Sequence, residues 1–301
     1  MHGILPLWKP KGKTSHDCVK IVRDYFRNKK VGHTGTLDPE VEGVLPLCIG
    51  KATKIVPFLT DTKKTYIAEV TLGLSTDTQD AHGRMVERKQ IDHLPSQRAI
   101  EKAIKSFEGN IVQIPPMYSA VKVKGKKLYE YARAGESVDR PRRRVRIFSI
   151  EYLHQDDEQH RFSFKVVCSK GTYIRTLCVD IGKTLGYPAH MSKLIRTGTG
   201  SFTKADTVTF ADIDDAARND RLNELLLPLN SGLDHLDTVY VDKATKARIR
   251  FGQKLSMPDE KPQTDPFLMM YGQKLLAIYQ MHPKNPEQIK PVRVLNTEHD
   301  C

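Results

Sequence analysis

The sequence predicts an α+β protein, in which a mixed, largely antiparallel sheet packs with helices and a small β module follows at the C-terminal end. Stretches with strand-like alternation and stretches with helical spacing follow one another without the regular rhythm of a parallel α/β sheet. Beyond about residue 235, short strand-like runs separated by turn residues dominate. The 301 residues suffice for one large domain and one small one.

Three helices are expected, over about 14–26, 96–107 and 172–185. The first two begin at good N-cap residues, Thr14 with Ser15, and Ser96, and apolar residues then recur at helical spacing. In the third, apolar residues form one buried stripe and Gly186 supplies the end signal.

Strands are expected over 66–72, around 145–153 and over 162–168, where β-branched and aromatic residues alternate with polar ones. A domain boundary is expected near Gly232-Leu233-Asp234. The tail beyond it contains four short strand-like runs, a hairpin turn at Tyr271-Gly272-Gln273-Lys274 and an exposed loop over 257–262. This pattern by itself predicts only a small β module.

The composition is that of an ordinary soluble globular protein with a basic balance. Hydrophobic residues make up 39% and charged residues 28%, and the formal net charge is +12, which favours a polyanionic partner. No apolar run approaches the ~20 residues of a membrane span. The N-terminal residues lack the features of a signal peptide, so we expect a cytoplasmic protein. The five scattered cysteines indicate neither a disulfide framework nor a zinc site.

The segment between Lys122 and Arg146 is strongly basic, with ten basic residues against three acidic ones. A solvated surface loop would account for a shorter run of this kind. Here Tyr129 and Tyr131 are interleaved, which suits phosphate contacts combined with base stacking. The residues that we expect to contact an RNA backbone are Lys122, Lys124, Lys126, Lys127, Arg142, Arg143 and Arg144.

A glycine-punctuated turn, Gly32-His33-Thr34-Gly35-Thr36-Leu37-Asp38-Pro39, presents a single carboxylate. Gly32 and Gly35 permit backbone angles or close approaches that a Cβ would block, and Pro39 favours an extended conformation at Asp38. An ordinary Asx-type turn would explain an isolated Asp-Pro pair.

The stretch from Val31 to Lys54 resembles the TruB family of tRNA pseudouridine synthases, whose G-H-T-G-x-L-D-P motif it contains. The resemblance begins at Leu7-Trp8-Lys9-Pro10, continues to about Gly200 and includes Gly171-Thr172-Tyr173-Ile174-Arg175. It implies that Lys9-Pro10 supports the catalytic loop. It also implies a catalytic domain of the pseudouridine-synthase type over 1–232, and a small PUA-like β-barrel that binds RNA over 235–301.

The catalytic residues that this resemblance implies are Asp38, Tyr66 and Arg175. Asp38 would be the nucleophile, a role that needs an ionised, poorly hydrated carboxylate with a cationic partner. Arg175 would form that ion pair, although by its sequence alone it reads equally well as a solvated arginine on a helix surface. Tyr66 would stack on the target base and take part in a later proton transfer; without the resemblance it reads as a buried aromatic at a strand edge.

The same resemblance implies a substrate pocket that includes His33, Tyr66, Tyr173 and Leu194. Tyr173 would contact the flipped-out nucleotide, and Leu194, which is a core residue by default, would form an apolar wall. A histidine between small residues is more often a structural hydrogen-bonding residue than a general acid. For His33 the resemblance implies packing against the RNA, where the ring helps to fill the gap left by the extruded base.

The reaction that the resemblance implies is isomerisation of uridine 55 to pseudouridine in the TΨC arm of tRNA, with no cofactor and no metal. The segment over about 115–146 matches the RNA-gripping insertion of stand-alone members, which implies a monomer without an obligatory protein partner. Guide-RNA-dependent relatives generally lack this insertion. A tRNA-binding or tRNA-folding module in which catalysis is secondary is the alternative from another class. Asp38 could attack C6 of uracil or C1′ of ribose.

Overall fold

The protein is described here by a computed structural model over residues 1–295. In chain order, the larger part consists of β1 (Gly3–Lys9), α1 (Ser15–Tyr25), β2 (Val31–His33), β3 (Glu42–Ile49), the 3-10 helix η1 (Gly50–Ile55), α2 (Val56–Thr60), β4 (Lys64–Leu72), β5 (Leu74–Thr76), β6 (Met85–Arg88), α3 (Gln97–Lys105), β7 (Gly109–Gln113), β8 (Lys122–Val123), β9 (Lys126–Lys127), α4 (Leu128–Ala134), β10 (Arg143–Asp156), β11 (Arg161–Cys168), α5 (Ile174–Thr184), β12 (Ala189–Thr199), β13 (Phe202–Thr203), η2 (Lys204–Asp206), α6 (Phe210–Arg218) and η3 (Leu222–Leu225). A smaller part follows, with β14 (Thr238–Tyr240), α7 (Lys243–Arg250), β15 (Leu255–Ser256), β16 (Phe267–Tyr271), β17 (Lys274–Met281) and β18 (Gln288–Val294).

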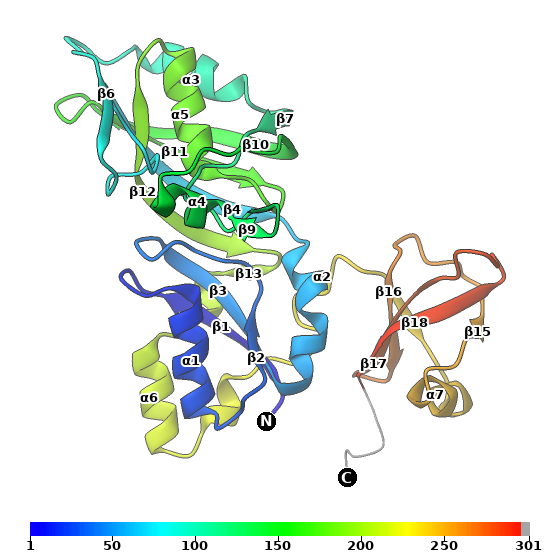
Figure 1. The fold of residues 1–301 in the computed structure, drawn as a ribbon. Helices are drawn as coiled ribbons and strands as arrows, with labels where there is room; N and C mark the ends of the chain where they lie inside the picture. Colours follow the sequence, from blue (N-terminus) through cyan, green and yellow to red (C-terminus); the bar gives the residue numbers. More distant parts are fainter. Residues whose placement is uncertain (296–301) are drawn as a thin grey trace.

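The larger part is built around a nine-stranded sheet (Figure 1). Its main path runs β1-β3-β12-β4-β11-β10-β7, with β2 paired to β3 and β13 paired to β12. Among the described strands of this sheet, only β3 and β12 pair in parallel. The predicted α+β class with a largely antiparallel sheet is therefore confirmed.

The predicted helices form close to the expected positions. Thr14 caps α1 by accepting a hydrogen bond from the Asp17 amide, and Ser96 caps α3 in the same way. α5 begins two residues later than expected, at Ile174, and the chain leaves it through Gly186 at φ 83°. The apolar face of α5 packs against β12 and β4, which brings the start of this helix to the middle of the sheet.

The C-terminal part is a curled five-stranded sheet in the order β14-β16-β17-β18-β15 (Figure 1, orange to red). Tyr271 pairs with Lys274 across the predicted hairpin turn. This part also contains the helix α7, which the prediction of a purely β module missed. Leu268, Met270 and Leu275 share an apolar cluster with Cys48 and Ile55, so this sheet packs on the larger part near η1.

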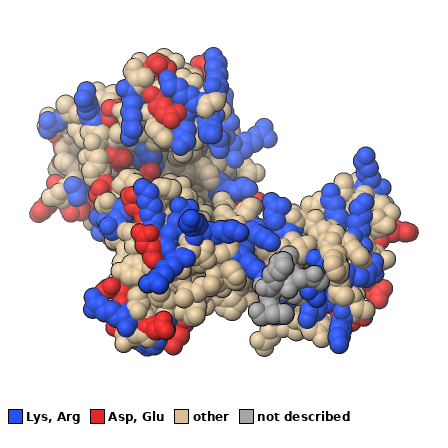
Figure 2. Space-filling view, turned by 60° about the horizontal axis from the view of Figure 1, so that its bottom comes forward, with Lys and Arg blue, Asp and Glu red and all other residues tan. Residues whose placement is uncertain are grey.

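The basic segment is not one continuous surface loop. β8, β9 and α4 form a small folded unit, and the chain then returns to the main sheet as β10. Arg142, Arg143 and Arg144 are exposed where β10 begins. Figure 2 shows Lys and Arg side chains around the hollow of one face and over the C-terminal part.

The structure describes four of the five cysteines. Cys18, Cys48, Cys168 and Cys178 are free and buried, whereas Cys301 lies outside the described residues. Within residues 1–295 there is no cluster of three or more potential metal-ligating His, Cys, Asp or Glu side chains. The helices of the same range are too short or too polar to cross a membrane.

Candidate active site

The loop between β2 and β3 carries Asp38 and is fixed by buried polar contacts. The Ser15 hydroxyl accepts a hydrogen bond from the Leu37 amide at 2.9 Å and donates one to the Leu37 carbonyl at 3.2 Å. The Lys9 ammonium, which is fully buried, donates to the Pro39 carbonyl at 3.0 Å. Lys9 therefore supports the loop from inside the protein, as the sequence analysis expected of it.

Glycines are required at one position in this loop and at one position in the strand that follows it. Gly35 has a φ of 149°, a conformation that side chains rarely adopt. At Gly43, just after the loop, a Cβ would lie 2.2 Å from the Arg196 carbonyl oxygen, so only glycine lets β3 approach β12 this closely. The expectation for Gly32 was wrong, because a Cβ there would make only an ordinary contact with Val56 at 3.7 Å.

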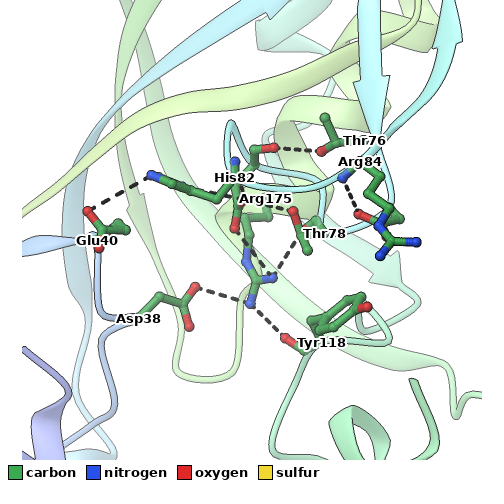
Figure 3. A network of polar contacts seen from close by, with 10 residues as sticks. Asp38, Glu40, Thr76, Thr78, His82, Arg84, Tyr118 and Arg175 are labelled. Atoms are coloured by element: carbon green, nitrogen blue, oxygen red, sulfur yellow. Dashed lines mark hydrogen bonds and ion pairs between the residues drawn. The ribbon is translucent and has the colours of Figure 1, made fainter. Parts of the chain in front are cut away.

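Asp38 and Arg175 point toward one another in the centre of the site (Figure 3). Nη2 of Arg175 lies 3.1 Å from Oδ2 of Asp38. The arginine side chain is 8% exposed and the aspartate side chain 43% exposed. Reading Arg175 as a solvated surface arginine is therefore wrong. A half-exposed carboxylate held by a buried guanidinium is well placed to meet a substrate from the solvent side.

The Arg175 guanidinium is oriented by backbone carbonyls as well as by Asp38. Nη1 donates to the Thr78 carbonyl at 3.0 Å and Nη2 to the Tyr118 carbonyl at 2.9 Å. Oδ2 of Asp80 lies 4.0 Å from Nη1. The segment around Thr78 and the start of the predicted insertion thus meet at one side chain, which Figure 3 shows.

Asp38 and Arg175 both line a cavity of about 450 Å³. Tyr66 from β4, Tyr173 at the start of α5 and Leu194 from β12 also line this cavity. Gln113, at the end of β7, fixes the Tyr173 backbone by accepting from its amide at 2.9 Å and donating to its carbonyl at 3.1 Å. Tyr118 and Tyr129 line the cavity as well. One carboxylate, four tyrosines and an apolar wall suit a planar polar ring that a nucleophile must reach.

His33 stands apart from this group. It is half-buried at the end of β2, and its Nδ1 accepts a hydrogen bond from the Gly35 amide at 3.3 Å. It is not among the residues that line the cavity. Burial, helped by the nearby Arg196 cation, lowers the His33 pKa, which fits a neutral ring whose Nδ1 accepts a hydrogen bond.

The predicted RNA-contacting residues differ in their surroundings. Lys126 forms an ion pair with Glu136 at 2.9 Å and lies over the Tyr131 ring. Lys127 donates a hydrogen bond to the Tyr129 hydroxyl at 3.1 Å, and Tyr129 in turn lines the cavity. In contrast, Lys122, Lys124, Arg142, Arg143 and Arg144 are exposed.

Two buried cations in the cavity wall were missed by sequence reasoning. Arg196 is 2% exposed and Lys64 is 5% exposed, and both line the cavity. Burial, with a smaller effect of Arg196, lowers the pKa of Lys64 to about 8. Alternation along strands would have found both residues, because Lys64 shares a strand face with Tyr66 and Arg196 shares one with Leu194.

Burial also perturbs the Tyr66 phenol. It raises the Tyr66 pKa, while the neighbouring Arg196 guanidinium acts in the opposite direction. The phenol therefore stays protonated at neutral pH and can act as a hydrogen-bond donor within the cavity.

Comparison with protein families gives two adjacent matches. Residues 23–174 match the model described as TruB family pseudouridylate synthase (N terminal domain). Residues 175–234 match the model described as tRNA pseudouridylate synthase B C-terminal domain. The two matches meet at Arg175, so both contribute residues to the cavity.

Curated relatives are similar over almost the whole chain. A tRNA pseudouridine synthase B of Oceanobacillus iheyensis is 60% identical over 299 residues, which cover 99% of each chain. One of Bacillus anthracis is 46% identical, with 98% of this chain and 97% of the relative covered.

Solved structures support the same fold. A chain in the crystal structure of a Cbf5-Nop10-Gar1 complex has a TM-score of 0.78 and 28% identity, covering 98% of this chain and 85% of that chain. A chain in an H/ACA RNP bound to a substrate RNA containing 2′-deoxyuridine has a TM-score of 0.75 and 25% identity, covering 98% and 85%.

Proposed function

The chain belongs to the TruB family of pseudouridylate synthases, and from this premise we propose that it converts uridine 55 of tRNA to pseudouridine, with Asp38 as the nucleophile. The relatives that carry the name tRNA pseudouridine synthase B support tRNA as the substrate. The observation that carries the role of Asp38 is its ion pair with the buried Arg175 at the mouth of the cavity.

The reaction breaks the C1′–N1 bond and joins C1′ to C5 of the same base. No atom is gained and no electron is exchanged, so the reaction itself requires no cofactor. A carboxylate can form the transient covalent bond that such a rearrangement needs, at C6 of uracil or at C1′ of ribose. Arg175 holds this carboxylate in one orientation. Such fixed positioning lowers the barrier more in a site with little water than it would in solvent.

The cavity would receive a nucleotide that has been flipped out of its stack. In this proposal Tyr66 stacks on the uracil ring, Tyr173 contacts the nucleotide and Leu194 forms the apolar wall. All three side chains line the same cavity as Asp38, which supports the assignment. His33 lies beside the catalytic loop, where it would pack against the RNA around the extruded base.

Tyr66 offers a test of stacking. We expect Tyr66→Leu to weaken binding of the flipped nucleotide more than Tyr66→Phe, because base–aromatic stacking contributes about 1–3 kcal/mol. Tyr66→Phe keeps the ring and loses only the hydroxyl, so it separates stacking from proton transfer. Binding is measured with a tRNA transcript and the rate in a single turnover. Equal binding by the Leu and Phe variants would count against stacking.

The exposed basic residues at the start of β10 are proposed to grip the RNA backbone together with the unit formed by β8, β9 and α4. This grip includes Lys122, Lys124, Lys126 and Lys127. Lys and Arg side chains border the hollow of this face in Figure 2, which supports an extended polyanion as the ligand.

The grip should contribute affinity rather than chemistry. We expect the triple variant Arg142→Ala, Arg143→Ala, Arg144→Ala to bind tRNA more weakly at low salt. The slope of log K against log salt should fall by roughly 0.7–0.9 for every phosphate that the variant no longer neutralises. The single-turnover rate at saturating tRNA should change much less.

A matched control removes three exposed cations from α3, by Arg98→Ala, Lys102→Ala and Lys105→Ala. This control should change the salt slope less than the β10 variant does. An unchanged slope with a lost chemical step in the β10 variant would instead assign these arginines to support of the active site.

We propose a catalytic domain over 1–232, with the insertion over about 115–146, and a PUA-like RNA-binding module over 235–301. Residues 296–301 of this module lie outside the described part of the chain. We further propose that the protein acts as a cytoplasmic monomer without an obligatory partner. The likeness to a Cbf5-Nop10-Gar1 complex makes a partner-dependent synthase the alternative, and activity of the purified chain on tRNA alone separates the two.

A further inference from the structure

Arg196 occupies an unusual position in the wall of the cavity. It lies on β12 with its Cα paired to Tyr66 of β4 on one side and to Gly43 of β3 on the other. Its Nε donates to the Val44 carbonyl at 2.8 Å, and its Nη2 donates to the Gly35 carbonyl at 3.2 Å. The guanidinium therefore joins the sheet to the loop that carries Asp38.

The charge of Arg196 is buried without a carboxylate partner. The side chain belongs to the largest fully buried ones, yet no Asp or Glu in residues 1–295 comes within ion-pairing distance. Its two backbone acceptors are neutral carbonyls. A buried cation of this kind carries a large desolvation cost, which negative charge brought by a bound substrate would offset.

The other two buried cations of the cavity wall are engaged in a different way, because Arg175 is paired with a carboxylate and Lys64 uses all its donors. Arg175 donates to Thr78, Tyr118 and Asp38. The three ammonium hydrogens of Lys64 face the Thr60 carbonyl at 2.6 Å, the Thr62 carbonyl at 2.7 Å and the Thr62 hydroxyl at 3.2 Å. Arg196 has five N–H donors, uses two of them on carbonyls and also interacts with the Tyr66 phenol, which leaves donors for a substrate.

We propose that Arg196 is a further catalytic residue, which donates to the uracil ring and stabilises the negative charge that develops on the ring during the rearrangement. The proposal rests on the proposed function and assigns the electrostatic part of the same reaction. Arg196 lies beside the Tyr66 phenol, donates to the Gly35 carbonyl of the Asp38 loop and lines the same cavity as Leu194. A base stacked on Tyr66 would present its edge to this guanidinium.

The charge arises by either route of attack. When the C1′–N1 bond breaks, its electron pair stays with the ring, which becomes an anion delocalised over N1 and the carbonyl oxygens. When a carboxylate adds to C6, the electron pair of the C5–C6 bond likewise moves toward the C4 carbonyl oxygen. In both cases the C1′–N1 bond is broken, C5 bonds to C1′, and the transient bond from the carboxylate to C1′ or C6 breaks to restore the free carboxylate. The C5 proton leaves and N1 gains a proton. Arg196 keeps all its protons throughout.

The test compares two leaving groups. Fluorine at C5 withdraws electrons, so 5-fluorouracil carries negative charge more readily than uracil and depends less on an external cation. Single-turnover loss of the N-glycoside is measured on tRNA transcripts that contain uridine or 5-fluorouridine.

The variants are Arg196→Met and Arg196→Gln, where Gln is neutral but keeps one donor for the loop carbonyl. Arg218→Met, an exposed arginine on α6, is the matched control.

We expect both Arg196 variants to lose roughly 10²–10³-fold in rate on uridine, the usual effect of removing one donor to a developing oxyanion. The loss of rate on 5-fluorouridine should be about one tenth of the loss on uridine, or smaller still. Arg218→Met should match the natural protein on both substrates.

Equal losses on the two substrates would overturn the proposal and leave Arg196 as a support of the loop only, and so would unchanged rates. If Arg196→Met fails to fold, Arg196→Gln carries the same comparison. The natural protein is measured alongside. No conversion of uridine by it would refute the proposed function itself, whereas conversion with equal variant losses would refute only the role of Arg196.

Discussion

Asp38→Asn is expected to abolish pseudouridine formation while tRNA binding stays within a few-fold of that of the natural protein. Asparagine preserves the shape of the side chain and its hydrogen-bonding capacity, but its amide is not a competent nucleophile. Loss of a nucleophile typically costs roughly 10⁴-fold or more in rate. The loop should keep its fold, because it is held by Ser15 and Lys9 rather than by the carboxylate.

Glu40→Gln is the matched control, since Glu40 is an exposed carboxylate two residues further along the same loop. It should retain the natural rate in a single-turnover assay, with binding measured separately for each variant. A rate near that of the natural protein for Asp38→Asn would remove Asp38 from the mechanism.

Arg175→Met is expected to have the second largest effect, a rate loss of roughly 10²–10³-fold. Methionine fills much of the space but removes the cation that holds Asp38, so the carboxylate would rotate freely at the mouth of the cavity. The carbonyls of Thr78 and Tyr118 also lose a buried donor, which should lower the free energy of unfolding by about 1–3 kcal/mol. Rates at saturating tRNA and thermal unfolding separate the two effects.

Arg175→Lys tests whether charge alone suffices. A lysine keeps the cation but cannot reproduce the planar fork that reaches two carbonyls and a carboxylate at once. We therefore expect it to recover only part of the rate. If Arg175→Met proves as active as the natural protein, the ion pair has no part in catalysis.

Local sequence signals predicted three helices and three strands of the larger part, namely α1, α3, α5, β4, β10 and β11. The N-caps Thr14 and Ser96, the alternation of 66–72 and the apolar stripe after Ile174 all act over one element, so the surrounding fold does not need to be known. α7 was missed because its sequence is rich in Lys and Arg and buries only Ile249, which leaves almost no apolar periodicity to detect.

The site was predictable where a motif marked it. Asp38, Tyr66, Tyr173, Arg175 and Leu194 meet in one cavity, although they come from four separate segments. Strand alternation could have placed Arg196 on the same face as Leu194, but no motif marks a role for it or for Asp80, because each gains its importance from a neighbour far away in the chain. Asp80 approaches Arg175 and Arg196 reaches Gly35 only after the sheet and α5 have assembled.

The measurement that tests the central claim most directly is tritium release from tRNA labelled at C5 of its uridines, with the purified chain as the only protein and no guide RNA. Formation of the C1′–C5 bond displaces the C5 hydrogen, so release reports the rearrangement itself. We expect release stoichiometric with tRNA from a transcript that carries uridine 55, and none from a matched transcript with cytidine at that position. Absence of release from the first, or equal release from both, would contradict the account.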